Sequence, residues 1–204
     1  MSDDPESYLT LIGPGTSEIK RRGSRFLGFA FPVSTEEQAQ QHLSELAAHH
    51  YDARHICHGL RVGLGAQRID RSNDDGEPPR SAGLPIWQVL STDEVENTLV
   101  AVVRYFGGTK LGIGGLQRAY RDAAQAALGD AGVHTHHPES SLVITLPYDR
   151  YDEFEYLVNE RESLRIAERT FTADVEITLA VWTSQLDATR GLLGGFLGCD
   201  PDDL

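Results

Sequence analysis

A glycine-rich stretch, RYFGGTKLGIGG at residues 104–115, places five glycines, one arginine and one lysine between an apolar run and a segment with helical spacing. Free N–H groups and the dipole at the start of a helix attract anions. Arginine, aromatic rings and glycine together suit phosphate or a nucleotide strand. The residues expected to bind phosphate or nucleic acid are Arg104, Tyr105, Phe106, Gly107, Gly108, Lys110, Gly112, Gly114, Gly115 and Arg118.

The same stretch has a purely structural interpretation. Glycine also permits turns and close packing of a helix against a sheet. In that case Arg104 would be a buried strut, paired with Asp75 or Glu77, and would matter for folding rather than for a ligand. The stretch matches neither GxxxxGK[ST] nor GxGxxG, so no standard nucleotide-binding motif decides between the two interpretations.

An acidic loop, NDDGEPPRSAG at residues 73–83, holds three carboxylates within four positions. Asp74, Asp75 and Glu77 could supply oxygen ligands to Mg²⁺ or Ca²⁺. With His55 as the base, they would make a metal-assisted hydrolase, which is the alternative function. A turn that leads into a capped helix is the simpler explanation. The sequence shows no complete ligand set and no activated nucleophile, so we predict no catalytic residue, no metal and no cofactor.

The segment DARHICH at residues 52–58 alternates as a strand does, with His55 and Cys57 on one face and His58 on the other. Two potential ligands on one face are too few for a closed zinc site. A cysteine–histidine nucleophile pair is conceivable. Packing of these side chains within the sheet is the more common arrangement.

Apolar patterns predict alternating strands and helices in the first two thirds of the chain. Ser34 and Glu37 form a capping box for the first helix, and the strand that precedes the glycines is apolar enough to be buried on both faces. The expected strands are 24–33, 54–63 and 97–106, and the expected helices are 34–50, 81–90 and 115–132.

A second unit is expected after the polar segment VHTHHPESS at 133–141, which is predicted to be a linker. We therefore predict two domains, residues 1–137 and 138–204, in an α+β protein. Thr183 or Ser184 should cap the last helix. In the second unit the expected strands are 141–148, 164–172 and 175–182, and the expected helices are 149–161 and 183–198.

The composition bounds the possible partners and the location. The net charge is −13, from 18 basic and 31 acidic residues, which argues against a generic nucleic-acid binder. The N-terminus lacks the pattern of a secretory signal, and no stretch approaches the ~20 apolar residues of a membrane span. Cys57 and Cys199 imply no disulfide framework. We expect a cytoplasmic protein with no membrane partner.

Three segments in this order, DARHICH, NDDGEPPRSAGLP and VVRYFGGTKLGIGGLQRAY, resemble the IMPACT/YigZ family over roughly residues 18–128. The resemblance implies an N-terminal α+β domain similar to the second domain of a small-subunit ribosomal protein. It also implies a small ferredoxin-like C-terminal domain similar to one in the translocating elongation factor.

The functional expectation comes from the same resemblance. The eukaryotic namesake of the family regulates translation initiation by competing for a partner of a starvation-activated kinase, and for bacterial members nucleic-acid or ribosome binding is the favoured proposal. We predict a non-catalytic binding protein, associated with RNA or the ribosome, that regulates translation. A protein–protein adaptor is a further alternative.

The sequence departs from the family pattern at one loop position. Many bacterial members have a glycine where this chain has Arg80, between Pro79 and Ser81. If that glycine lets a ligand approach the backbone, either the ligand is lost here or Arg80 contacts it, and Arg80 is therefore included among the expected phosphate-binding residues.

Overall fold

The computed structural model describes residues 6–204. The first five residues of the N-terminal segment that was considered for a secretory signal lie outside the described residues. The described chain divides into an N-terminal unit, residues 8–135, and a C-terminal unit that holds residues 136–204. Within residues 6–204, no helix combines the length and the low charge needed to cross a lipid bilayer.

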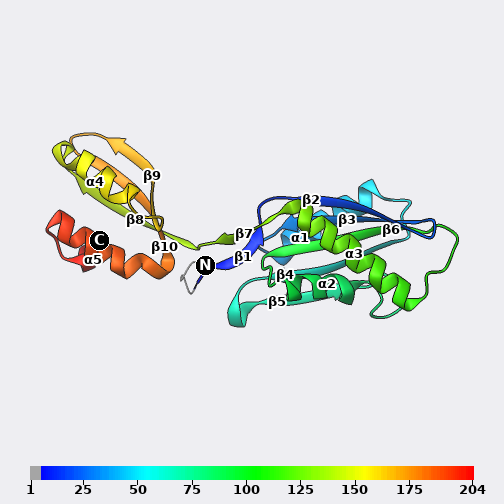
Figure 1. Cartoon of the computed structure of the whole chain (residues 1–204). Coiled ribbons are helices and arrows are strands. Elements are labelled where there is room, and N and C mark those ends of the chain that lie inside the picture. The colour runs from blue at the N-terminus through cyan, green and yellow to red at the C-terminus, as the bar shows by residue number, and fades with distance from the viewer. Residues whose placement is uncertain (1–5) are drawn as a thin grey trace. The chain divides into compact units, whose positions relative to one another are not determined.

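The N-terminal unit is built on a five-stranded antiparallel sheet (Figure 1). The strand order is β2-β3-β6-β4-β5, so β6 pairs with both β3 and β4 in the centre. The strands are β2 (Gly15–Arg21), β3 (Ser24–Pro32), β4 (His55–Val62), β5 (Ile69–Asn73) and β6 (Thr98–Tyr105).

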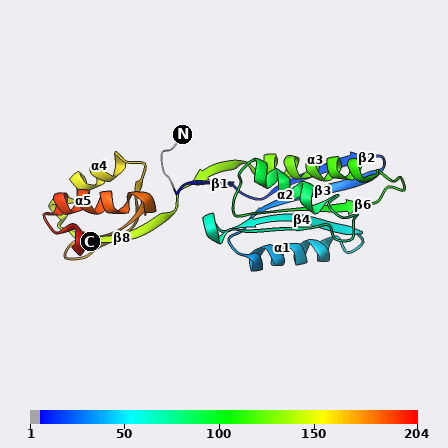
Figure 2. The ribbon, with the colours of Figure 1, turned by 90° about the horizontal axis from the view of Figure 1, so that it is seen from below.

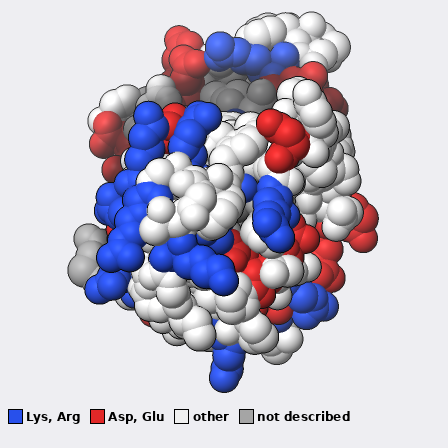
Figure 3. Space-filling view, turned by 90° about the vertical axis from the view of Figure 1, so that its right-hand side faces the viewer, with Lys and Arg blue, Asp and Glu red and all other residues white. Residues whose placement is uncertain are grey.

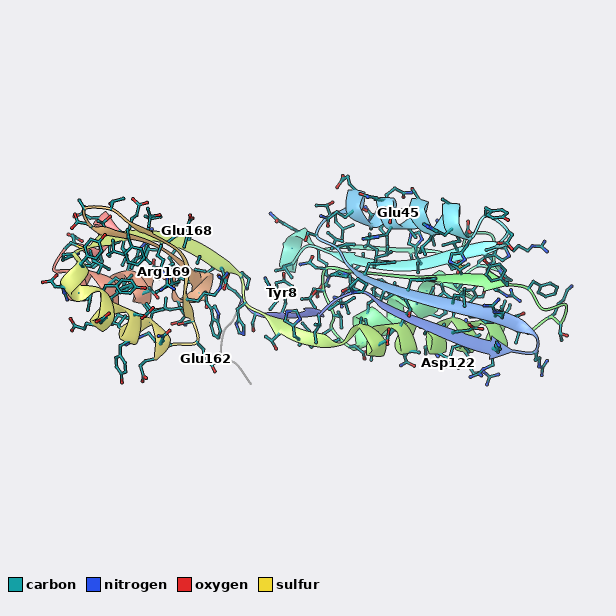
Figure 4. The ribbon with its side chains drawn as sticks, turned by 90° about the horizontal axis from the view of Figure 1, so that it is seen from above. Tyr8, Glu45, Asp122, Glu162, Glu168 and Arg169 are labelled. Atoms are coloured by element: carbon teal, nitrogen blue, oxygen red, sulfur yellow. The ribbon has the colours of Figure 1, made fainter. Side chains whose placement is uncertain are left out.

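Helices cover both faces of this sheet (Figure 2). One face carries α1 (Glu36–His49), and the other carries α2 (Gly83–Thr92) and α3 (Ile113–Ala131). In Figure 4, Glu45 of α1 and Asp122 of α3 mark these opposite sides.

The central strand β6 is buried on both faces, which confirms that prediction. Val100 and Val102 belong to the core under α2 and α3, whereas Leu99 belongs to the smaller core under α1. Each of these three side chains is fully buried. Because successive side chains of a strand point to opposite faces, a continuous apolar run is what two covered faces require.

The C-terminal unit has a three-stranded antiparallel sheet of order β8-β10-β9. Its apolar side chains form one core with the two helices, and the order β-α-β-β-α agrees with the prediction. The elements are β8 (Glu139–Leu146), α4 (Tyr151–Asn159), β9 (Leu164–Phe171), β10 (Val175–Trp182) and α5 (Leu186–Leu197), with short 3₁₀ turns at Tyr148–Arg150, Thr183–Gln185 and Pro201–Asp203.

Some local predictions were wrong. The expected linker contains a strand, β7 (Val133–His136), which pairs with β1 (Tyr8–Leu11). The cap of α1 is Thr35 rather than Ser34, because its hydroxyl accepts the N–H of Gln38 at 3.2 Å. At the start of α5, neither expected cap is used, because Thr183–Gln185 form a 3₁₀ turn and the helix begins at Leu186.

Candidate anion-binding site

A pocket of about 470 Å³ lies where β6 ends and α3 begins, and we call it the β6–α3 pocket. The acidic loop, the glycine-rich stretch and the start of α3 all contribute to its wall. The pocket brings together six of the expected site residues, namely His55, Glu77, Arg104, Phe106, Lys110 and Gly112.

Other expected residues lie outside the pocket lining. Tyr105 points to the α1 face, where its hydroxyl lies 2.9 Å from Nδ1 of His50 and 3.2 Å from Asp52 Oδ1. Arg80 and Arg118 are exposed. The remaining expected residues that do not line the pocket are Asp74, Asp75, Gly107, Gly108, Gly114 and Gly115.

Six lining residues were not expected from the sequence. A cation, Arg54, stands just before β4, and it carried no signal beyond its place in the DARHICH segment. The other five are small or apolar residues, and nothing in the sequence marks them as part of a site; the tertiary structure brings them to the pocket wall. The unexpected residues are Arg54, Gly76, Pro78, Leu111, Ile113 and Leu116.

Arg104 is a buried strut, as the structural interpretation required. It is 6% exposed, and its Nη1 donates to Oε1 of Glu77, which is 8% exposed. The Tyr120 hydroxyl donates to the same oxygen at 2.9 Å. The guanidinium carbon also lies 5.4 Å from the ring centres of Phe26 and of Phe106. Arg104 therefore joins the acidic loop to β6, and Tyr120 joins the loop to α3.

One atom of this strut has no partner. Among the described residues, Nε of Arg104 is buried without a hydrogen-bond acceptor. Arg104 lines the β6–α3 pocket, so its positive charge would lie close to a ligand bound there. The charge of Glu77 is matched by Arg104 and therefore does not make the pocket anionic.

Asp74 is a helix cap rather than a metal ligand. Its carboxylate accepts the N–H groups of Ala82 and Gly83 at 2.9 and 2.8 Å, just where α2 begins. It also accepts the N–H of Arg80 at 2.7 Å. These are the free N–H groups that a helix start leaves for a capping side chain.

Asp75 holds the same loop against β4. Its carboxylate accepts the N–H of Ile56 at 2.6 Å, and its carbonyl oxygen lies 2.6 Å from Nδ1 of His55. The three carboxylates of the acidic loop are thus committed to backbone N–H groups, Arg104 and Tyr120. Within residues 6–204, no cluster of three or more His, Cys, Asp or Glu side chains has the arrangement of a metal site.

Cys57 is packed in the sheet. It is fully buried, and its thiol donates to the carbonyl of Asp74 at 3.0 Å. Burial raises the pKa of this thiol far above its ordinary value. A nucleophilic cysteine needs a lowered pKa, so the cysteine–histidine alternative is not supported.

The fold explains most glycines of the stretch without a ligand. A Cβ on residue 107 would lie 1.9 Å from the carbonyl carbon of Gly23, so the two backbones require glycine there. Gly108 and Gly112 have φ of 84° and 70°, the left-handed region that favours glycine. At Gly115, a Cβ would approach Leu111 Cβ to 3.1 Å. Only at Gly114, where a Cβ would meet open space, does the fold of this stretch give no reason for glycine.

The start of α3 is open to an anion. Its N-cap is Gly112, which has no side chain to cap the helix, and the first turn has no acidic residue. The N–H groups of Gly115 and Leu116 donate to the Gly112 carbonyl at 3.1 and 3.0 Å. In the described chain, the N–H groups of Ile113 and Gly114 have no acceptor.

Basic side chains gather on this end of the N-terminal unit, beside a smaller group of acidic ones (Figure 3). The turn between β2 and β3 reaches the glycine-rich stretch, where Gly107 N–H donates to the Ser24 hydroxyl at 3.1 Å. Two cations in the strands that flank this turn are neutralised: Arg21 pairs with Asp122 and Arg25 with Glu18, both at 3.0 Å. By contrast, neither Arg54 nor Lys110 forms an ion pair with any described residue.

Comparison with known proteins gives consistent results. The Impact N-terminal domain family matches residues 22–128. The IMPACT family member YigZ of Escherichia coli (strain K12) is 30% identical over 193 residues, which cover 94% of this chain and 94% of the relative. The IMPACT family member YvyE of Bacillus subtilis (strain 168) is 40% identical over 127 residues, 62% of this chain and 58% of the relative. The match therefore spans little more than half of the Bacillus protein.

A solved structure described as that of a hypothetical protein is similar over 94% of this chain and 93% of its own, with 28% identity and a TM-score of 0.65. It supports the two-unit α+β fold. The domain match covers more than half of the sequence, and the Escherichia coli relative matches nearly throughout. The chain therefore belongs to the IMPACT family.

Proposed function

We propose that this protein is a non-catalytic binding module that binds RNA, on its own or in the ribosome, and that acts in the regulation of translation in the cytoplasm. The observation that carries the proposal is the β6–α3 pocket. Two unpaired cations, Arg54 and Lys110, and the uncapped start of α3 converge there beside the half-exposed ring of Phe106. Positive groups for the backbone and a flat ring for a base are what single-stranded nucleic acid needs.

Family membership supplies the translation context. We also propose that the N-terminal unit is similar in fold to a ribosomal-protein domain. The C-terminal unit is proposed to be similar to a ferredoxin-like domain of an elongation factor. The metal-assisted hydrolase is not proposed, because Asp74, Asp75 and Glu77 stabilise the fold through the bonds described above.

The experiment is a titration of the full chain with a fluorescently labelled single-stranded RNA at several salt concentrations. Binding should weaken as salt rises, with a log–log slope of about 0.7 for each phosphate neutralised. The double variant Arg54→Ala/Lys110→Ala should weaken binding and reduce this slope by about two phosphate equivalents.

Lys20→Ala is the matched control, because Lys20 is the only other lysine and pairs with Glu18 at 3.6 Å outside the pocket. It should leave binding nearly unchanged. An RNA affinity that does not depend on the salt concentration would contradict the proposal. A complex that forms only with a protein partner, and survives nuclease treatment, would favour the adaptor instead.

A further inference from the structure

The β6–α3 pocket has an excess of unmatched positive charge. Arg54 and Lys110 lie at its wall without an ion-pair partner in the described chain. Arg104 adds a buried Nε that has no acceptor. Among the described residues that line the pocket, Glu77 is the only one with a carboxylate, and its charge is matched by Arg104.

The start of α3 adds directed donors to this charge. The N–H groups of Ile113 and Gly114 have no acceptor within residues 6–204, and no side chain caps the helix. Such N–H groups, with the positive end of the helix dipole, bind phosphate oxygens well. Two cations and a helix start match a phosphomonoester, with a charge of about −1.5 to −2, better than a phosphodiester with about −1.

The remaining wall suits a flat apolar group. Phe106 is 46% exposed and Ile113 is 58% exposed, and both line the pocket. The volume of about 470 Å³ is in the usual range for a small-molecule site. A nucleobase can stack on the ring of Phe106 while its phosphate lies at the start of α3.

We propose that the β6–α3 pocket binds one nucleotide that carries a phosphomonoester, with the phosphate held by Arg54, Lys110 and the first N–H groups of α3, and the base against Phe106. The nucleotide can be the 5′-phosphorylated end of an RNA or a free nucleoside monophosphate. The first source rests on the RNA-binding function proposed above, whereas the second does not need it.

The experiment compares ligands that differ by one group, using the full chain. Adenosine monophosphate, adenosine and inorganic phosphate are titrated by calorimetry, and one RNA sequence is titrated with a 5′-phosphate or a 5′-hydroxyl. The monophosphate should bind at least about tenfold more tightly than adenosine or inorganic phosphate, because each of these lacks one part of the recognised group. The 5′-phosphorylated RNA should bind about tenfold more tightly than the 5′-hydroxyl RNA.

Ile113→Glu tests the position of the phosphate. A carboxylate in the first turn favours the helix through its dipole, so the melting temperature should be unchanged or higher, while monophosphate binding should be lost. Gln125→Glu adds the same charge to an exposed position of α3 outside the pocket lining. It should leave binding and melting temperature nearly unchanged.

The outcomes separate this inference from the proposed function. If the 5′-phosphorylated and the 5′-hydroxyl RNA bound with equal affinity, and if Ile113→Glu did not change that affinity, the inference would be overturned while RNA binding itself would stand. Monophosphate binding without RNA binding would support the pocket and overturn the RNA function. The inference would also be overturned if adenosine monophosphate bound no more tightly than adenosine and inorganic phosphate, and if the 5′-phosphate did not change the affinity for RNA.

Discussion

Arg104 and Glu77 form the most deeply buried ion pair around the β6–α3 pocket, at 6% and 8% exposure. Replacing Arg104 with methionine would leave the carboxylate of Glu77 buried without its cation. We expect Arg104→Met to lower the free energy of unfolding by about 3–5 kcal/mol. Urea denaturation monitored by circular dichroism measures this loss.

The control for that variant is Arg104→Met combined with Glu77→Gln. Glutamine keeps an oxygen that can accept from Tyr120 but has no charge to bury, so the double variant should lose less stability than Arg104→Met alone. Equal losses would mean that packing of the Arg104 side chain, and not the buried charge, determines the effect.

His58 gives the protein a pH-dependent contribution to stability. Burial in β4 lowers the pKa of His58 below its ordinary value of 6.5, and the nearby Asp75 opposes this shift only in part. The folded protein then binds fewer protons at His58 than the unfolded chain does. Stability from this residue is therefore complete above about pH 6.5 and is lost as the pH falls below it.

We expect His58→Gln to reduce this acid sensitivity. Thermal melts of the natural and the variant protein at pH values between about 5 and 8 measure it, because an unperturbed histidine, as in the unfolded chain, changes its charge within that interval. The variant should show a smaller drop in melting temperature below about pH 6.5. An equal drop in both proteins would show that other groups account for the acid sensitivity.

At the scale of elements, the acidic loop is tightly bonded yet contains a residue in an unfavourable conformation. Arg80 has φ of 62°, in the left-handed region that favours glycine, and its N–H is held by Asp74. This is the position at which the family resemblance predicts glycine. The left-handed conformation costs a residue with a Cβ about 1–2 kcal/mol.

We expect Arg80→Gly to raise the free energy of unfolding by about 1 kcal/mol, since it removes this cost. Arg80→Ala keeps the Cβ and should leave stability nearly unchanged, which separates the backbone from the side chain. Chemical denaturation of both variants provides the comparison. A stability gain in Arg80→Ala equal to that in Arg80→Gly would point to the arginine side chain instead.

Elements with a strong apolar pattern could be predicted from the sequence, and those with a weak pattern could not. β6 could be predicted because it is a nearly continuous run of Val, Leu and Ala, and seven of its eight residues are buried in the structure. β2 was missed: its seven residues, GTSEIKR, contain a single large apolar side chain, Ile19, as is common at the edge of a sheet. β7 was expected to be part of a linker because residues 133–141 are polar and contain a proline; in the structure its four residues, VHTH, are exposed.

For the candidate site, local motifs located the glycine-rich stretch and the acidic loop, but not their contacts. Pairing of Arg104 with either Asp75 or Glu77 was among the sequence alternatives, and only the fold selects Glu77. Arg54 and Leu116 are 62 positions apart by their numbers, yet both line one pocket. Such long-range contacts depend on strand order, which periodicity does not specify.

At the scale of the whole molecule, the division near residue 136 predicts that the N-terminal unit can fold alone. The unit has its own cores on both faces of a five-stranded sheet. We expect a fragment of residues 1–137 to unfold in one cooperative transition on heating, as single domains of this size usually do. Differential scanning calorimetry tests this directly.

Strand pairing supplies the comparison for that fragment. A shorter fragment that ends before Val133 would lack β7, the partner of β1, and should melt at a lower temperature than residues 1–137. An insoluble or non-cooperative product from residues 1–137 would contradict the proposed boundary.

The close approach of Gly23 to Gly107 has a mechanical consequence for the β6–α3 pocket. The glycine-rich stretch is anchored at one end by backbone contact with the β2–β3 turn and at the other by the first turn of α3. Between these anchors, Lys110 lies on a span of only a few residues, in which Gly108 and Gly112 have the left-handed backbone conformation. A span this short has few backbone conformations to lose, so binding of a phosphate at Lys110 would cost little backbone entropy.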